Sequence, residues 1–154
     1  MDRPAASRPL VSIVVPVFNA GPYLDQALGS LTGQTYGNLE IICLNDGSTD
    51  DSLAIMERHG AEDGRIRIID KANEGYGATC NRGIDEARGD WIGILEPDDW
   101  LLPGAIEAMV SAAEEAARAM GGPNAAATAP AAPDLVKTPY WRVLFPDAPE
   151  QALA

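Results

Sequence analysis

Short apolar segments alternate with amphipathic helical patterns along the chain, and this alternation restricts the possible folds more than any other feature. The apolar segments are rich in β-branched residues and cover residues 11–18, 39–44, 65–70 and 91–95. Segments that are apolar on both faces are typical of strands covered on both sides by helices. Strands that alternate with helices form right-handed βαβ units, so the pattern predicts an α/β fold with a doubly wound, mostly parallel sheet.

Helical patterns occupy the stretches between these segments. Leu24, Leu28 and Leu31 share one helix face, and a later apolar stripe follows Pro103. Ser48 and Asp51 have the spacing of a capping box, which predicts that they open the second helix. We expect a disordered leader over residues 1–10, one domain over 11–120, a flexible Pro/Ala/Gly loop over 121–133, and an incomplete second half over 134–154 that starts with one strand over 134–143.

Charge and composition exclude several classes of function. Lys and Arg total 11 against 23 Asp and Glu, so the net charge is −12, and nucleic acid is not an expected partner. The same charge means that an anionic ligand would need a local cation. Cys43 and Cys80 stand alone in apolar segments, so we expect both to be buried thiols in a reducing compartment. No apolar run reaches the roughly 20 residues that span a bilayer.

Polar residues follow the first, second and fourth predicted strands. Asn19 follows the first strand, Asn45-Asp46 the second, and Glu96-Pro97-Asp98-Asp99 the fourth. The carboxyl ends of parallel strands meet at one edge of a sheet, where open α/β folds bind ligands. The sequence therefore predicts a binding site at this edge.

Each of these clusters also has a purely structural interpretation. The acidic cluster offers oxygen ligands to Mg²⁺ or Mn²⁺, although acidic turns before helices are common. Asp46 is positioned to accept a hydrogen bond from a base N–H, while its neighbours cap a helix. Gly75 and Gly77 precede a helix and would let a ligand approach the backbone, but Cys80 stands where a dinucleotide fingerprint needs its third glycine.

The order of the motifs resembles the start of the family 2 glycosyltransferases. The resemblance covers about residues 11–109 and rests on the segments V-S-I-V-V-P-V-F-N-A, S-L-T-G-Q-T-Y, L-N-D-G-S-T-D-D-S, N-E-G-Y-G-A-T-C-N-R-G-I and G-D-W-I-G-I-L-E-P-D-D-W-L. It implies the three-layer α/β/α, Rossmann-like GT-A fold. It also implies a nucleotide-diphosphate sugar donor, inversion at the anomeric carbon, and Mn²⁺ or Mg²⁺ as cofactor.

The resemblance also implies roles for individual residues. Asp46 would hold the base, which is usually uracil, so a UDP-sugar is the expected donor. Asp98 would face the ribose or the metal, and Asp99 the metal that bridges the diphosphate. Glu96 stands where Asp is more usual. The remaining residues carried over by the motifs line the nucleoside pocket (Pro16, Val17, Phe18 and Asn19) or lie near the ribose and diphosphate (Gly75 and Asn81).

No acidic residue after the Pro/Ala loop stands in a pattern typical of the catalytic base, which an inverting transferase needs. The resemblance places that base in the second half of the catalytic domain. We therefore expect a truncated chain with a donor site but little transfer activity, which could self-associate. The expected acceptor is a saccharide or glycolipid in the synthesis of bacterial surface polysaccharide or glycoconjugates, in the cytoplasm or at the inner face of the membrane.

Other functions stay open at this point. A nucleotidyltransferase would want a basic glycine-rich loop after the first strand, and Asn19-Ala20-Gly21-Pro22 has no Lys or Arg. A non-catalytic nucleotide-binding or interaction module would be favoured by nucleotide binding that is absent or independent of metal.

Overall fold

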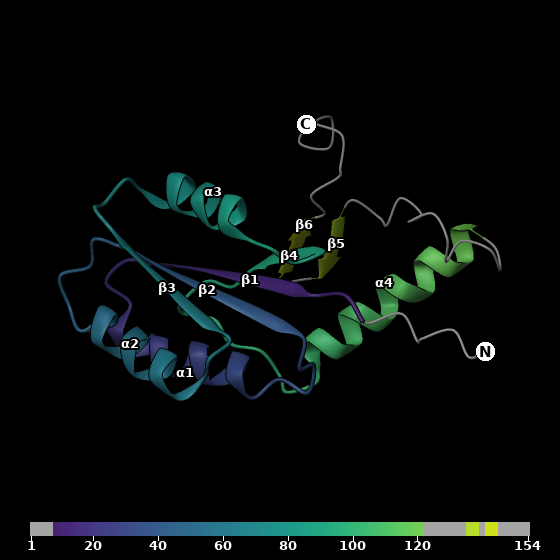
Figure 1. The fold of residues 1–154 in the computed structure, drawn as a ribbon, viewed down its shortest axis with the longest axis horizontal. Coiled ribbons are helices and arrows are strands. Elements are labelled where there is room, and N and C mark those ends of the chain that lie inside the picture. The colour runs from purple at the N-terminus through teal and green to yellow at the C-terminus, as the bar shows by residue number, and fades with distance from the viewer. Residues whose placement is uncertain (1–7, 122–134, 139–140, 145–154) are drawn as a thin grey trace.

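The computed structural model describes residues 8–121, 135–138 and 141–144, with side chains described over residues 8–116 (Figure 1). The elements in chain order are β1 Val11–Val17, α1 Gly21–Thr32, β2 Leu39–Asp46, α2 Ser52–Glu62, β3 Ile66–Lys71, α3 Tyr76–Glu86, β4 Trp91–Ile94, α4 Ala105–Gly121, β5 Leu135–Thr138 and β6 Trp141–Leu144.

One sheet of six strands runs through the molecule in the order β3-β2-β1-β4-β6-β5. Strands β3, β2, β1 and β4 are parallel, and β6 joins β4 antiparallel. Helices α1 and α2 lie on one face of the sheet and α3 lies on the other (Figure 1). This arrangement confirms the predicted three-layer α/β/α fold with a mostly parallel sheet.

The alternation of side chains along β1 separates two hydrophobic clusters. Val11, Ile13, Val15 and Val17 belong to the larger cluster, which also contains the apolar faces of α1 and α4. Val14 points the other way and packs in a smaller cluster with β2, β4 and the partly buried Ile84 of α3. Because successive strand residues face opposite sides, an uninterrupted apolar run supplies both layers at once.

Helix α3 lies unusually close to the sheet at Gly83. A Cβ atom built on Gly83 would lie 2.3 Å from Cγ1 of Val14 and 3.0 Å from Cδ1 of Leu44. Only a residue without a side chain allows this approach. The close contact fixes the height of α3 above β1 and β2, and therefore the position of its first turn at the sheet edge.

The predicted capping box is wrong. Helix α2 begins at Ser52, and Asp51 at its N-cap makes no side-chain capping hydrogen bond. Asp50 takes that role, because its Oδ1 accepts from the Ser52 amide at 3.0 Å. The Ser48 hydroxyl instead accepts from the Asn19 amide at 3.0 Å. Ser48 and Asp51 thus have the spacing of a capping box, but neither side chain caps α2.

Two other expectations differ from the structure at the ends of the domain. The single strand expected over residues 134–143 is two antiparallel strands, β5 and β6. Arg8, placed in the expected leader, stacks on the Tyr36 ring at 4.6 Å from its centroid and pairs with Glu107 at 2.5 Å. Residues 1–7 and 122–134, as well as Tyr140, lie outside the described residues.

The predicted burial of the cysteines is confirmed, since Cys43 and Cys80 are both buried free thiols. Among the described residues, none of the helices combines the length and the hydropathy that crossing a bilayer requires.

Candidate functional site at the carboxyl edge of the sheet

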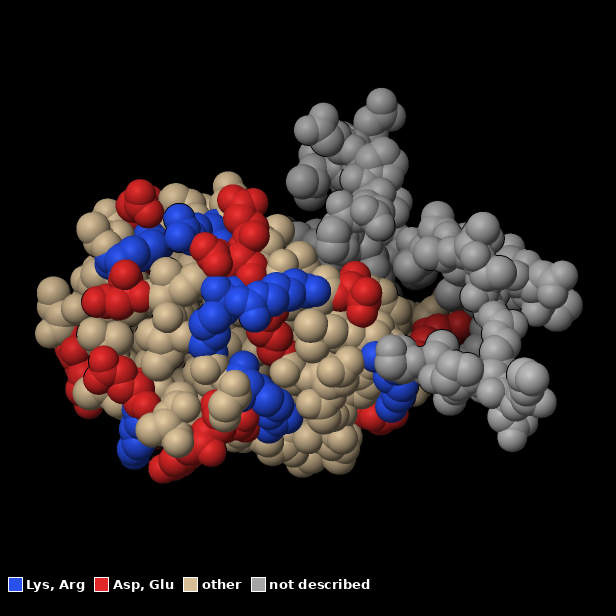
Figure 2. Space-filling model, viewed as in Figure 1, with Lys and Arg blue, Asp and Glu red and all other residues tan. Residues whose placement is uncertain are grey.

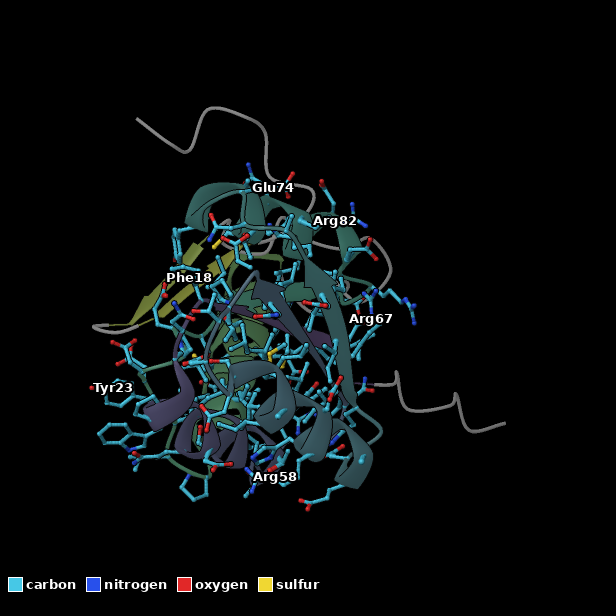
Figure 3. All side chains as sticks on the ribbon, turned by 90° about the vertical axis from the view of Figure 1, so that its left-hand side faces the viewer. Phe18, Tyr23, Arg58, Arg67, Glu74 and Arg82 are labelled. Carbon is cyan, nitrogen blue, oxygen red and sulfur yellow. The ribbon has the colours of Figure 1, made fainter. Side chains whose placement is uncertain are left out.

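The polar groups predicted to meet at one sheet edge do follow strands that end side by side. Val17 of β1 pairs with Asn45 of β2, and Asp46 pairs with Lys71 of β3. On the other side of β1, Val14 pairs with Ile94 at the end of β4. The loops after all four strands therefore share this edge. Figure 3 shows Phe18 there, between Glu74 near α3 and Tyr23 on α1.

The loops after β1 and β2 are joined by hydrogen bonds that begin at Asn19. Asn19 adopts a left-handed backbone conformation (φ 50°), which Asn tolerates better than most residues. Its Oδ1 accepts from the Thr49 amide at 2.7 Å. The next two amides in the chain are also satisfied from the second loop, by Ser52 Oγ for Ala20 and Asp50 Oδ2 for Gly21. The first turn of α1 is thus fixed by the loop that follows β2.

Asp46, predicted to hold a base, already has several donors. Its residue is only 3% exposed. Oδ1 accepts from Lys71 Nζ at 2.5 Å and from the Glu74 amide at 2.9 Å. Oδ2 accepts from the Gly75 amide at 3.0 Å. Burial opposes ionisation, but these hydrogen bonds and the Lys71 charge outweigh it and lower the pKa of Asp46.

These contacts make Asp46 the anchor of the loop between β3 and α3. Gly75 caps α3 in a left-handed conformation (φ 91°) that favours glycine. The Asn73 side-chain amide donates to the Asp46 carbonyl at 2.9 Å. The Thr79 side chain on the first turn of α3 also hydrogen-bonds to Asp46 and helps to lower its pKa, so this carboxylate gathers donors from both the loop and the helix.

The acidic cluster after β4 forms a turn at the same edge. The Asp99 amide donates to the Glu96 carbonyl at 3.1 Å, and the Tyr76 hydroxyl at the start of α3 donates to Glu96 Oε1. Asp98 and Asp99 are both exposed. Within the part of the chain that the structure describes, no three His, Cys, Asp or Glu side chains form a group that could hold a metal ion.

The remaining predicted site residues divide into buried and exposed groups. Pro16 is buried, and Val17 is fully buried in the larger hydrophobic cluster. The side chain of Val17 therefore supports the edge from below. Phe18 is 53% exposed, and Asn81 is exposed on the second turn of α3.

The described basic side chains are all paired with carboxylates. The pairs include Lys71 with Asp46 and Glu74, and Arg82 with Glu86; the others involve Arg8, Arg58, Arg65, Arg67 and Arg88. Figure 2 shows basic and acidic side chains interspersed on the face it displays. No described Lys or Arg is therefore left without a carboxylate at the sheet edge.

Two residues of the edge, Lys71 and Tyr76, were not among the predicted site residues. Lys71 directly follows the third predicted strand, so the placement rule that selected Asn19 and Asp46 applies to it equally. Tyr76 lies between the two glycines already noted. Its contact with Glu96, twenty residues further along the chain, has no local sequence signal.

Residues 12–141 match the family described as Glycosyl transferase family 2. The chain belongs to glycosyl transferase family 2. EpsH of Bacillus subtilis (strain 168), which is named as a glycosyltransferase, is 43% identical over 105 residues, covering 68% of this chain and 30% of EpsH. Chondroitin synthase of Escherichia coli is 41% identical over 99 residues, covering 64% of this chain and 14% of the synthase. The chain thus spans less than a third of either relative.

Solved structures of glycosyltransferases share the fold. TarS of S. aureus in complex with UDP-GlcNAc superposes with a TM-score of 0.64 at 24% identity, covering 68% of this chain and 31% of TarS. The mannosyltransferase PcManGT of Pyrobaculum calidifontis, in complex with GDP-Man and Mn²⁺, gives a TM-score of 0.58 at 22% identity and covers 62% and 29% of the two chains. At these identities the likeness concerns the fold.

Proposed function

We propose that this chain carries the donor-binding part of a glycosyltransferase that uses a nucleotide-diphosphate sugar. The observation that carries the proposal is the arrangement of the carboxyl edge. The loops that follow the parallel strands present exposed Phe18 and the exposed acidic pair Asp98-Asp99, and Asn81 is exposed on the second turn of α3. Open α/β sheets bind their ligands at such an edge.

The base would lie beside Asp46, and UDP is the nucleotide that we propose. Carboxylate oxygens accept more than one hydrogen bond each, so Asp46 suits an N–H donor of the base, such as N3–H of uracil. Gly75 at the cap of α3 leaves room for the ribose and diphosphate to approach the backbone. The similarity in fold to TarS, whose structure contains UDP-GlcNAc, supports a nucleotide sugar at this edge.

A divalent ion suits the residues present, provided that the ligand supplies part of its coordination. Asp98 and Asp99 offer carboxylate oxygens, and Mg²⁺ is commonly held by one or two carboxylates plus substrate phosphates. Every basic side chain described over residues 8–116 is already paired with a carboxylate, so a divalent ion would supply the positive charge that a diphosphate needs there. When bound, Mn²⁺ or Mg²⁺ would stabilise the leaving diphosphate as a Lewis acid.

The rest of the reaction is proposed on the family resemblance. It would invert the anomeric carbon and transfer the sugar to a saccharide or glycolipid acceptor, in the synthesis of surface polysaccharide or glycoconjugates at the inner face of the membrane. The similarity to chondroitin synthase supports a polymer-forming context.

We also propose that the chain self-associates through exposed apolar side chains such as Trp100, which light scattering would test.

Calorimetric titration of UDP, with GDP as control, tests the donor site. Each nucleotide is titrated with Mn²⁺, with Mg²⁺ and with a chelator, into the wild type and an Asp99→Asn variant. Asp85→Asn is the matched control, because Asp85 is exposed, lies near the far end of α3, and loses the same charge.

We expect UDP to bind in the presence of a divalent ion, and Asp99→Asn to weaken that binding at least tenfold, which is about 1.4 kcal/mol. Asp85→Asn should bind as the wild type does. UDP affinity that is the same with and without a divalent ion would favour a non-catalytic nucleotide-binding module. A folded chain that binds neither nucleotide would refute the donor-site proposal.

A further inference from the structure

Tyr76 joins the two halves of the proposed donor site. It is the first residue of α3, directly after Gly75, whose amide is held by Asp46. Its hydroxyl donates to Oε1 of Glu96, at the start of the acidic turn. The nucleoside side of the edge and the metal side are therefore linked by one short path of backbone and hydrogen bonds.

The hydrogen bond from Tyr76 orients the Glu96 side chain in a segment that has few other attachments to the sheet. The Leu95 amide donates to the Val14 carbonyl at 2.9 Å, which is the last described backbone bond that ties this segment to the sheet. Beyond it, the turn is closed by the Asp99 amide and the Glu96 carbonyl. The Tyr76 hydroxyl is a side-chain contact that attaches this turn to α3.

In the hydrogen bond between Tyr76 and Glu96, the tyrosine hydroxyl is the donor and the carboxylate is the acceptor. Burial raises the pKa of the Tyr76 hydroxyl, and its hydrogen bonds with Glu96 and Cys80 raise it further, so the hydroxyl stays protonated and donates. The Tyr76 residue is nevertheless 57% exposed, so a large aromatic side chain is kept at the surface while its hydroxyl is engaged.

We propose that Tyr76 is a positioning residue, which holds Glu96 so that the turn carrying Asp98 and Asp99 is preset for a metal-bound diphosphate. This inference rests on the donor-site function proposed above. Tyr76 acts through Glu96 and the turn, and the path to Asp46 means that nucleotide contact on one side is transmitted to the acids on the other.

The test compares variants that break the contact in different ways. Tyr76→Phe keeps the ring and removes the donor. Glu96→Asp keeps the charge and shortens the side chain by one methylene, which takes the carboxylate out of reach. Tyr23→Phe is the matched control, because Tyr23 is equally exposed (57%) and lies on α1.

The first readout needs no nucleotide. Amide hydrogen exchange of Asp99, followed by NMR, should be about three- to tenfold faster in Tyr76→Phe and in Glu96→Asp than in the wild type, the range expected for losing one partly exposed hydrogen bond. The double variant should exchange no faster than either single variant, because both remove the same contact. Unchanged exchange in Tyr76→Phe would overturn the proposal, as would additive effects in the double variant.

The second readout is the ratio of the UDP dissociation constants measured without and with Mn²⁺. Tyr76→Phe should lower this ratio by about three- to tenfold and leave the metal-free constant unchanged, while Tyr23→Phe changes neither. A loss that is equal with and without Mn²⁺ would indicate a general structural effect and overturn the positioning role. If the wild type binds no UDP, the donor function fails, and the amide exchange alone decides whether Tyr76 orders the turn.

Discussion

Asp46 gives the sharpest prediction, because the structure assigns its carboxylate a measurable structural role besides base binding. Replacing Asp46 with Ala removes the acceptor of Lys71 Nζ and of the Glu74 and Gly75 amides. Both charged side chains are largely shielded, with 5% of Asp46 and 13% of Lys71 exposed. Removing one partner of a buried ion pair costs about 3 to 5 kcal/mol.

Two features of the site reduce that cost. Lys71 keeps the exposed Glu74 carboxylate at 3.0 Å and the Ala72 carbonyl at 3.3 Å, and water can reach the loop amides. We therefore expect Asp46→Ala to lower the free energy of unfolding by about 2 to 3 kcal/mol. Asp46→Asn keeps the volume and one acceptor but turns an N–H₂ towards other donors, so it should cost about 1 to 2 kcal/mol.

Urea denaturation at several pH values measures both effects. Because the pKa of Asp46 is lowered in the folded state, its contribution is complete above the unfolded pKa of about 3.9 and is lost as the pH falls through the folded value. The gap between the wild type and Asp46→Ala should thus be constant near pH 7 and narrow below about pH 4. A cost under about 0.5 kcal/mol at pH 7, which is typical of an ordinary surface change, would show that Asp46 does not anchor the loop, as would a gap that stays constant on acidification.

Two further predictions concern packing and thiol chemistry. Gly83→Ala should lower the free energy of unfolding by about 1 to 2 kcal/mol in urea denaturation, because a contact of 2.3 Å with Val14 outweighs the gain in helix propensity of about 1 kcal/mol. Gly29→Ala, where no heavy atom lies within 4 Å, should instead stabilise α1 by up to about 1 kcal/mol, and equal effects at the two glycines would contradict this account. Burial raises the pKa of Cys43 to about 12 and also raises that of Cys80, so a thiol reagent should modify neither until the protein unfolds. Rapid labelling of the native chain would show that one of the thiols is accessible.

The fold was predictable because its main signals are local. The apolar run at residues 11–18 became β1 over Val11–Val17. Side-chain alternation and helix periodicity act within a few residues, so a sequence displays them directly. The separation of β5 from β6 was not predicted, because the two strands lie inside what the sequence pattern presents as one strand-like segment.

The position of the candidate site was predictable from the sequence, but its hydrogen-bond network was not. Parallel strands bring the residues after Asn45 and Val17 to one edge whatever side chains they carry, so topology alone selects Asn19 and Asp46. The sequence gives no sign of which oxygen accepts from which donor, since those contacts depend on loop conformations such as the positive φ of Asn19. Asp50 illustrates the difference, because it satisfies amides of both α1 and α2 while the capping-box rule selected its neighbour.

The hydrogen bonds of Asp46 extend beyond the proposed base contact, so a substitution there would change more than base binding. Asp46 orders Gly75 and hence the first turn of α3, and Tyr76 in that turn reaches Glu96. A substitution of Asp46 would then weaken nucleotide binding in two ways, by removing a hydrogen-bond acceptor and by making the acidic turn less ordered. Lys71→Met separates them, because it leaves the Asp46 carboxylate and both amide donors in place while removing the ion pair. If UDP binding survives Lys71→Met and fails in Asp46→Asn, nucleotide binding depends on the Asp46 carboxylate, and the ion pair contributes to stability. If both variants lose UDP binding equally, the ion pair is what holds the loop.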